Sequence, residues 1–332
     1  MFVRRNIFGI LLLVFLGACS KEPPREAYFG GMIKNPVDKY VLLYRHYIPA
    51  GHIDTFLLDA QGRFGHKIKL DSADMYFFLH GDQTNLCYLR PGDSLLVYSN
   101  MMSFDNSMQF SGMGAGFNNL ILRISLISAN EIDMLTNLIY RSDKEMLLSY
   151  INQYDLSKQN EIQKYLARLP DDYMFTTKEE EVLNYSVYFP DFYLLEGYNT
   201  VHADDSVAYS FPFHFSLNDS YHPVHYFLAA YLYAYMYHRL HLPDSLTPTD
   251  CLKIARKVDK MINDTVNREF VKFQLITNQL STQKQPPSPK QFRDILTVFP
   301  RVFHYSEDFS REFINLYNLY PHTGRLEMDS IN

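Results

Sequence analysis

The chain has 332 residues, carries a formal net charge of −6 and is 47% hydrophobic. It is long enough to bury the core of one large domain or two ordinary ones. A mildly acidic chain without a basic cluster lacks the positive surface that nucleic acid requires, which excludes that class of partner. After the N-terminal segment, no stretch reaches the roughly 18 uncharged residues needed to span a bilayer.

The first residues have the pattern of a lipoprotein signal peptide. Arg4 and Arg5 form a short basic start, an apolar run follows, and the sequence Leu-Gly-Ala-Cys ends at Cys19. We therefore expect residues 1–18 to be removed, Cys19 to carry a palmitate-type lipid, and residues 19–26 to form an extended tether. The alternative is an ordinary secretory signal with a chance cysteine. The expected location is the bacterial cell envelope, at the outer membrane, with either face left open.

Residues 27–112 are predicted to form short strands separated by turns. The segment is rich in Tyr, Phe, Leu, Ile and Val, and several stretches alternate apolar and polar residues. Eight short strands with no helix between them favour an antiparallel β-sandwich or a barrel-like fold. The expected strands are Ala27–Ile33, Tyr40–Tyr47, His52–Asp59, Arg63–Leu70, Met75–His80, Asn85–Leu89, Ser94–Ser99 and Met108–Phe110.

Two turns punctuate these strands. Residues 59–62, with the sequence Asp-Ala-Gln-Gly, suit a type I turn that places Gly62 in the left-handed region and joins two strands as a hairpin. Residues 91–93, Pro-Gly-Asp, suit a turn with proline at its first corner.

A cluster of glycines marks the end of the strand pattern. Gly112, Gly114 and Gly116 follow the last predicted strand and precede the first predicted helix. Such a cluster could cradle a phosphate, but that requires a strand-helix-strand unit, and here helices follow helices. We therefore interpret it as a turn between two domains.

From Phe117 onward the apolar residues recur with the period of a helix, so residues 117–332 are predicted to be all-α. A first apolar stripe runs from Leu120 to Leu138. Further helices are expected at Asp143–Tyr154, Asn160–Leu169, Thr177–Tyr185, Val224–Leu240, Asp250–Asn263, Arg268–Leu280, Pro289–Phe299 and Asp308–Leu319. The predicted fold class is α+β: an N-terminal antiparallel β-sandwich or barrel-like domain followed by an all-α helical domain.

Several strings in the first 120 residues resemble one known group. They are Gly31-Met32-Ile33, Asp54 to Phe64, Leu89 to Leu95, and Phe110 to Ala115 with Asn118 and Leu120. They resemble the N-terminal part of Bacteroidota-type lipoproteins that carry a thioredoxin-like (AhpC/TSA or TlpA-like) domain at their C-terminus. In that group a β domain and a helical segment precede the redox domain. The resemblance implies an envelope location and a β-then-α architecture.

The redox chemistry of that group does not carry over to this chain. Its active site needs a Trp-Cys-x-x-Cys-type pair, because thiolate and disulfide must exchange through a low-pKa cysteine. The chain has no tryptophan and three cysteines, Cys19, Cys87 and Cys251, which are far apart in sequence. The resemblance therefore supplies no catalytic residue.

Cys87 and Cys251 leave two alternatives open. In an oxidising periplasm they could form a disulfide that ties the two domains together. The other alternative is that each is a buried free thiol, since cysteine packs like a small hydrophobe. Neither has the surroundings of a nucleophile.

The segment around residues 211–242 is rich in histidines and aromatic residues. His222 with His225, and His238 with His241, are spaced to share a helix face, and His214 lies just upstream. The pairs fall at opposite ends of the predicted helix, so we expect no metal site. An aromatic groove that stacks on sugar rings or a peptide is a sharper alternative to a packed core. Its candidate residues are Phe213, Tyr226, Tyr233 and Tyr237.

No catalytic motif is recognisable, and we expect no catalytic residues, no cofactor and no metal. The sequence favours a lipid-anchored envelope protein of non-catalytic binding or scaffold type, whose partner is an envelope protein or a glycan or peptide ligand. An accessory role in envelope thiol-disulfide chemistry and a hydrolase with an unrecognised site are the alternatives.

Overall fold

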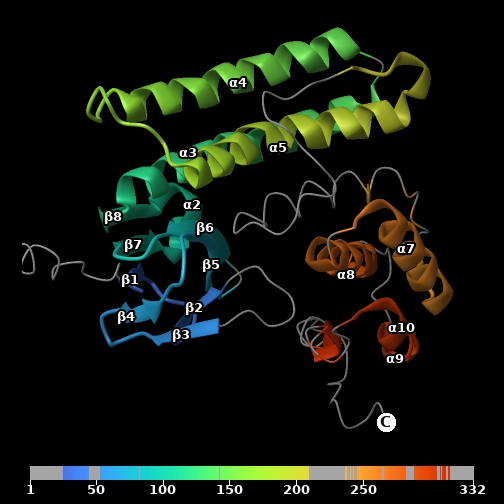
Figure 1. Cartoon of the computed structure of the whole chain (residues 1–332), viewed down its shortest axis with the longest axis horizontal. Coiled ribbons are helices and arrows are strands. Elements are labelled where there is room, and N and C mark those ends of the chain that lie inside the picture. The colour runs from blue at the N-terminus through green and yellow to red at the C-terminus, as the bar shows by residue number, and fades with distance from the viewer. Residues whose placement is uncertain are drawn as a thin grey trace, which may run out of the picture.

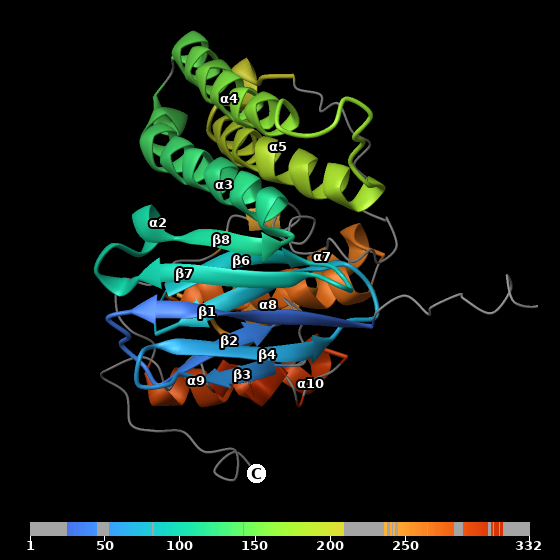
Figure 2. The ribbon, with the colours of Figure 1, turned by 90° about the vertical axis from the view of Figure 1, so that its left-hand side faces the viewer.

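A computed structural model describes residues 25–44, 53–81, 83–141, 143–208, 245–263, 265–281 and 288–304, with isolated residues between 236 and 314. Two four-stranded sheets come first in the chain and helices follow, which confirms the α+β class (Figure 1). The helices between residues 115 and 201 form a layer at one side of the sandwich, and those between residues 248 and 302 lie behind it (Figure 2).

Sheet A, in the order β4-β1-β7-β8, is mixed. Strand β1 is antiparallel to β4 but parallel to β7, and β7 is antiparallel to β8. The bounds are β1 Glu26–Lys34, β4 Arg63–Lys69, β7 Ser94–Asn100 and β8 Gln109–Met113. The prediction of a wholly antiparallel fold is therefore wrong for one pair, because the strands of the second sheet lie between β1 and β7 in sequence and supply the crossover that we had expected only a helix to make.

Sheet B, in the order β3-β2-β5-β6, is antiparallel throughout. Its strands are β2 Tyr40–Tyr44, β3 Ile53–Leu57, β5 Asp74–His80 and β6 Gln83–Leu89. The two sheets face each other across a core of aromatic rings, in which Phe29 of sheet A meets Phe56 and Phe78 of sheet B at centroid distances of 5.6 and 6.2 Å. This packing makes the fold a sandwich rather than a barrel.

The predicted turn at residues 59–62 is present, but it does not close a hairpin. Gly62 has φ +74° and its N–H bonds to the carbonyl of Asp59, as a turn with a left-handed glycine requires. The strands on either side lie in different sheets, so the turn carries the chain across the edge of the sandwich. Burial of Phe56 and Phe64 favours this arrangement, because strands in opposite sheets allow the two rings to meet across the core, with their centroids 5.7 Å apart.

Three long helices form the layer beside the sandwich. They are α3 Ala115–Leu135, α4 Lys144–Leu166 and α5 Thr177–Val201, with 3₁₀ turns η2 Thr136–Tyr140 after α3 and η3 Ala203–Asp205 after α5. Shorter elements, η1 Met101–Ser103 and α2 Phe104–Ser107, connect β7 to β8. Asp143 caps α4 by accepting from the N–H of Met146, and Thr176 with Glu179 forms a capping box on α5.

Two of these helices differ from their predictions. The two helices expected at 143–154 and 160–169 are one continuous α4, and α5 runs 16 residues beyond its expected end at Tyr185 to Val201. Helix α5 continues through Pro190, where a side chain of α3 supplies a hydrogen bond that the proline cannot, as described below.

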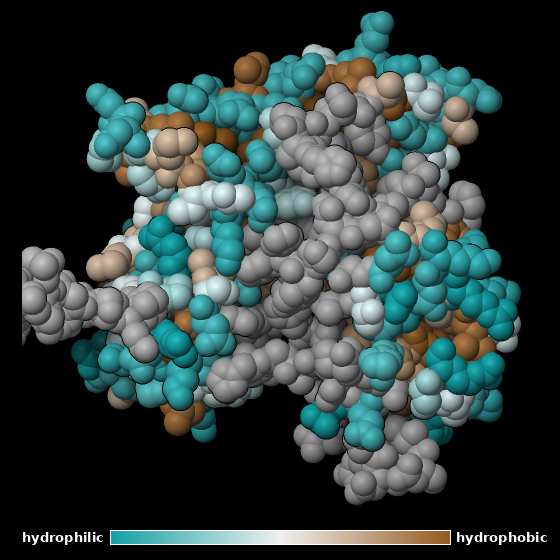
Figure 3. All heavy atoms as spheres, viewed as in Figure 1, coloured by the Kyte–Doolittle hydropathy of each residue, from teal (hydrophilic) through white to brown (hydrophobic). Residues whose placement is uncertain are grey.

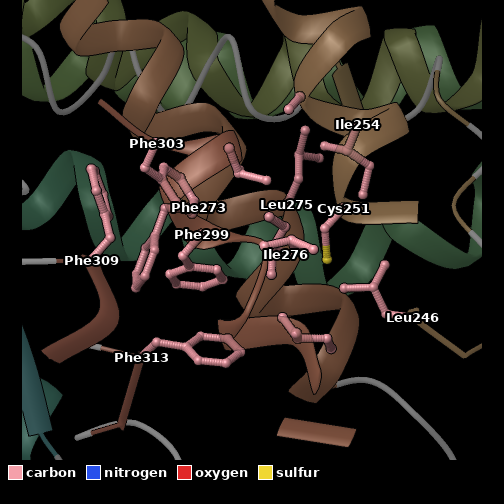
Figure 4. Packing of buried hydrophobic residues seen from close by; sticks show 14 of the residues in the cluster. Leu246, Cys251, Ile254, Phe273, Leu275, Ile276, Phe299, Phe303, Phe309 and Phe313 are labelled. Carbon is pink, nitrogen blue, oxygen red and sulfur yellow. The ribbon is translucent and has the colours of Figure 1, made fainter. Parts of the chain in front are cut away.

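The C-terminal helices pack around a core of their own (Figure 4). They are α7 Pro248–Met261, α8 Thr265–Ser281, α9 Pro289–Leu296 and α10 Phe299–Val302. Phe273, Phe303 and Phe309 contact one another there, with centroid distances of 4.4 to 6.1 Å. The helix expected at 224–240 lies almost wholly outside the described residues.

Helix α3 begins between the edges of the two sheets. Asn118 accepts from the N–H of Tyr88 and donates to its carbonyl at 2.7 and 2.8 Å. Asn119 makes the same pair of bonds with Phe110 at 2.9 and 2.8 Å. Because Tyr88 lies on edge strand β6 and Phe110 on edge strand β8, two adjacent side chains take the place that a further strand would hold on each sheet.

Candidate functional site

A fully buried lysine lies at the centre of the three-helix layer. The Nζ atom of Lys158 lies 2.7 Å from Glu131 Oε2 and 3.2 Å from both Asp155 Oδ1 and Asp191 Oδ1. It also donates to the carbonyl of Val187 at 2.7 Å. We call Glu131, Asp155, Lys158 and Asp191 the Lys158 cluster. A buried group of ionisable side chains is the first place to look for chemistry.

Each helix contributes to the cluster from a position on its apolar face. Glu131 lies between Ser128 and Leu135 on the buried side of α3. Lys158 continues the stripe of Leu147 and Ile151 on α4. Asp191 follows Val187 by one turn of α5, and Asp155 lies one turn before Lys158. The cluster therefore replaces apolar contacts in a helix-helix core with charged ones.

Pro190 leaves one backbone carbonyl of α5 without its helical hydrogen-bond donor. Proline has no N–H, so the carbonyl of Ser186 lacks its helical partner. The hydroxyl of Ser128 on α3 donates to that carbonyl at 3.2 Å. Lys158 donates to the neighbouring carbonyl of Val187. Side chains from α3 and α4 thus satisfy backbone groups where α5 carries its proline.

Burial sets the protonation of the cluster. It raises the pKa of Asp191 to about 9 and also raises the pKa of Glu131. Burial alone would lower the pKa of Lys158, but the nearby carboxylates of Asp191 and Glu131 outweigh it and raise that pKa. At neutral pH Lys158 is therefore an ammonium, while Asp191 holds a proton within hydrogen-bonding range of Glu131.

Three carboxylates around one point would also suit a divalent cation. Here the ammonium of Lys158 fills that point and serves as the cation of the site. In the part of the chain that the structure describes, no group of three or more His, Cys, Asp or Glu residues could hold a metal ion. Of the four members of the cluster, Asp155 is the one with substantial contact to solvent, its side chain being 27% exposed.

A second ionic group joins the helical layer to the sandwich. Arg90, in the turn after β6, donates to Glu179 Oε1 at 3.0 Å and to Asp93 Oδ2 at 3.3 Å. Glu179 also accepts from the N–H and hydroxyl of Thr176 in the capping box of α5. Both carboxylates are buried. We call Arg90, Asp93 and Glu179 the junction triad.

The C-terminal helices contain a comparable buried lysine. Lys272 on α8 donates to the carbonyl of Val302 at 2.6 Å and pairs with Glu269 and Asp259 at 2.5 and 3.2 Å. Glu269 in turn accepts from the N–H of His304 at 2.6 Å. Lys158 and Lys272 thus use the same device, an ammonium that bonds a backbone carbonyl of another helix and neighbouring carboxylates.

The predicted ligand-binding aromatics are not brought together within the described residues. Phe213, Tyr226 and Tyr233 lie outside those residues, and so do the five histidines between 214 and 241. Tyr237 is described, and its half-buried ring packs against the C-terminal core. Cys19, the predicted lipid site, also lies outside the described residues.

Cys87 and Cys251 are both free and buried, in different cores. Cys87 lies inside the sandwich, and Cys251 points among Leu246, Ile254 and Ile276 in Figure 4. The interdomain disulfide is therefore not formed, because each sulfur is enclosed by its own core. Burial raises the pKa of both thiols, that of Cys251 to about 12, which keeps them protonated and unreactive.

Sequence reasoning missed the Lys158 cluster and the junction triad. A signal for the first was present: Glu131, Lys158 and Asp191 each occupy a position where the helical period calls for an apolar residue. The predicted helices ended at Tyr154 and Tyr185, so Lys158 and Asp191 fell outside the ranges in which their position on a helix face could be recognised. For the junction triad no such periodicity exists, since its members come from a turn and a helix cap.

Comparison of the chain with protein-family models, with curated proteins and with solved structures finds no match. Among the described helices, none combines the length and the apolar character that crossing a membrane demands.

Proposed function

We propose that this protein is a non-catalytic scaffold or binding protein of the bacterial cell envelope, held at its membrane by a lipid on Cys19. The observation that carries the proposal is that the hydrogen-bonding capacity of the Lys158 ammonium is fully used within the helix layer. Its ammonium has three N–H donors, and a carbonyl of α5 and three carboxylates compete for them inside the helix layer. The charges that a reaction could use are therefore committed to holding helices together.

The junction triad supports the same proposal. Arg90 links the turn between the two sheets to the cap of α5, and Lys178 on α5 also donates to the carbonyl of Ala73 at 3.3 Å. These bonds hold the helical layer in a fixed orientation on the sandwich, whose first strand begins just after the proposed tether. Such an arrangement suits a protein that presents one surface to an envelope partner.

The anchor is tested by labelling cells with radioactive palmitate and comparing the wild type with Cys19→Ser. We expect label and membrane fractionation in the wild type, and loss of both in the variant, because the thiol of Cys19 is the point at which the acyl-bearing lipid is attached. A labelled Cys19→Ser protein would contradict the proposed site.

The binding role is tested by crosslinking the tagged, anchored protein in cells and identifying what is captured. We expect one envelope protein to be captured reproducibly, and captured less by the Arg90→Met variant, in which the fixed orientation is lost. Turnover of an ester, peptide or glycoside substrate by the purified protein, abolished in a folded variant of a described residue, would contradict a non-catalytic role.

A further inference from the structure

The outward face of sheet A is exposed to solvent (Figure 2). Residues alternate between the two faces of a strand, so the even-numbered residues of β1 and β7 point away from the core. Several of these outward residues are large and apolar or aromatic: Tyr28, Met32, Leu96, Tyr98 and, on β8, Met113. The strand register places Met32 beside Tyr98 and Gly30 beside Leu96. Gly30 is itself the outward position between Tyr28 and Met32 on β1. Tyr28, Met32, Leu96 and Tyr98 form one patch, and Met113 lies at its edge, beside Ser94.

The centre of this face is flat. Gly30 and Gly65 are paired across β1 and β4, and the ring of Tyr28 occupies the space that side chains at these two positions would fill. An aromatic ring laid over sheet glycines covers their backbone in this way. The result is a smooth surface, with no side chain standing up between the apolar patch and β4.

Basic residues border the patch. The outward positions of β1 and β4 carry Lys34, Arg63, Lys67 and Lys69, against one acid, Glu26. The chain as a whole has a net charge of −6, so this face is positive on an acidic protein. A positive face with tyrosines and apolar side chains is complementary to an anionic lipid surface, whose interface favours aromatic rings and attracts lysine and arginine.

The short segment between the proposed lipid anchor and β1 limits how far this sheet can lie from a membrane. Six residues lie between Cys19 and Glu26, the first residue of β1, so seven residue steps join the two. Whatever its conformation, such a segment reaches at most about 25 Å. A lipid on Cys19 therefore holds the start of β1, and with it the edge of sheet A at which this strand begins, within about 25 Å of the bilayer.

We propose that the outward face of sheet A lies on the membrane that holds the anchor, with its apolar patch at the interface and its basic residues on anionic headgroups. The proposal rests on the lipid anchor of the proposed function. A protein partner with an acidic surface is the competing occupant, and the experiments below separate the two.

Tryptophan reporters test the contact directly, since the chain contains no tryptophan. Met113 on sheet A and Met134 on α3 are matched in exposure, at 63% and 66%. The lipidated variants Met113→Trp and Met134→Trp are reconstituted separately into phosphatidylglycerol vesicles that contain brominated lipid. We expect the bromine to quench the fluorescence of the first variant severalfold more than that of the second. Equal quenching, stronger quenching at 134, or none at either position would overturn the proposal.

A charge reversal tests the electrostatic part. Lys67 and Lys164 are both exposed and each pairs with a glutamate, so Lys67→Glu and Lys164→Glu form a matched pair. We expect the unlipidated mature chain, made with Cys19→Ser, to bind phosphatidylglycerol vesicles about tenfold more weakly with Lys67→Glu, because the face loses two units of positive charge. Equal effects of the two substitutions would contradict the assigned face.

The results also distinguish failure of the anchor from failure of the docking face. If Cys19 carries palmitate but the tryptophan at position 113 is not quenched, the anchor is supported and the docking proposal is overturned. If the unlipidated Met113→Trp chain is quenched but the wild type carries no palmitate, the docking proposal is supported and the anchor is contradicted. A photo-crosslinker at position 113 that captures a protein in cells, in place of lipid, would identify the competing occupant and overturn the proposal.

Discussion

Lys158 illustrates how a charged residue can hold a helix layer together. Taking an ammonium out of water is costly, and its carboxylate partners and the carbonyl of Val187 offset that cost. Removing one partner of such a group leaves uncompensated charge in the core, which is far more damaging than never burying the group.

We predict that Lys158→Met lowers the free energy of unfolding by about 3–5 kcal/mol, because the fully buried Glu131 loses its cation and the carbonyl of Val187 loses a donor. Urea titrations followed by circular dichroism measure this. Lys164→Met, on the exposed side of the same helix, should cost less than about 1 kcal/mol. Comparable losses for the two variants would show that the cluster does not stabilise the layer.

Asp191 predicts a pH dependence of stability. Its pKa is about 9 in the folded protein and about 3.9 in an unfolded chain, so between these values the folded state holds a proton that the unfolded state has released. The contribution of Asp191 is therefore fully present below about pH 4 and is lost as the pH rises toward 9. Unfolding free energies measured across this range should fall more steeply with pH in the wild type than in Asp191→Asn. Parallel curves would contradict the raised pKa.

At the scale of elements, the sheet edges are closed by side chains. Asn118 and Asn119 each bond both the N–H and the carbonyl of one edge residue. Adjacent residues of a helix point in different directions, so a single turn of α3 can reach strands of two sheets. This couples the start of the helical layer to the sandwich through the backbone itself.

We predict that Asn118→Ala and Asn119→Ala each destabilise the protein by about 1–3 kcal/mol, since each leaves a backbone N–H and carbonyl without a partner. Hydrogen exchange should accelerate at the amide of Tyr88 in the first variant and at the amide of Phe110 in the second. Asn160→Ala, on the exposed surface of α4, is the control and should leave both amides protected. Unchanged exchange in the asparagine variants would refute this function of the side chains.

The elements themselves were largely predictable. All eight strands overlap their predicted ranges, because local pattern and burial agree there, although β8 runs through Gly112 to Met113, three residues past its predicted end at Phe110. Alternation does not reveal which strands pair, so the parallel contact of β1 with β7 could not be derived from it. The continuation of α5 through Pro190 was missed for a related reason: the donor that compensates for the proline, the hydroxyl of Ser128, belongs to another helix.

At the scale of the whole molecule, hydrophilic residues cover much of α4 and α7 on the face in view, and apolar residues show among them (Figure 3). The layers meet at the junction triad, where one arginine serves two buried carboxylates from different parts of the chain. No sequence pattern marks such a contact, because Arg90 and Glu179 are 89 residues apart and belong to no shared period. The junction triad is therefore recognisable only in the three-dimensional structure.

We predict that Arg90→Met destabilises the protein by about 3 kcal/mol, because Asp93 and Glu179 lose their cation while remaining buried. Calorimetry should show the transition broadening or dividing in two, as the sandwich and the helical layer uncouple. Arg63→Met, which removes a surface pair with Asp59, should change stability by less than about 1 kcal/mol. A single sharp transition of unchanged midpoint in Arg90→Met would refute the role of the triad.

The central place of β1 in sheet A has a mechanical consequence. Seven residue pairs join β1 to β4 on one side, and seven join it to β7 on the other. For a chain held by a lipid on Cys19, drag on the protein enters the fold at Arg25 and pulls along the axis of this strand. Force in that direction loads both ladders in shear, so many hydrogen bonds must give way together rather than one after another. The strand nearest the anchor is thus the one best placed to bear tension.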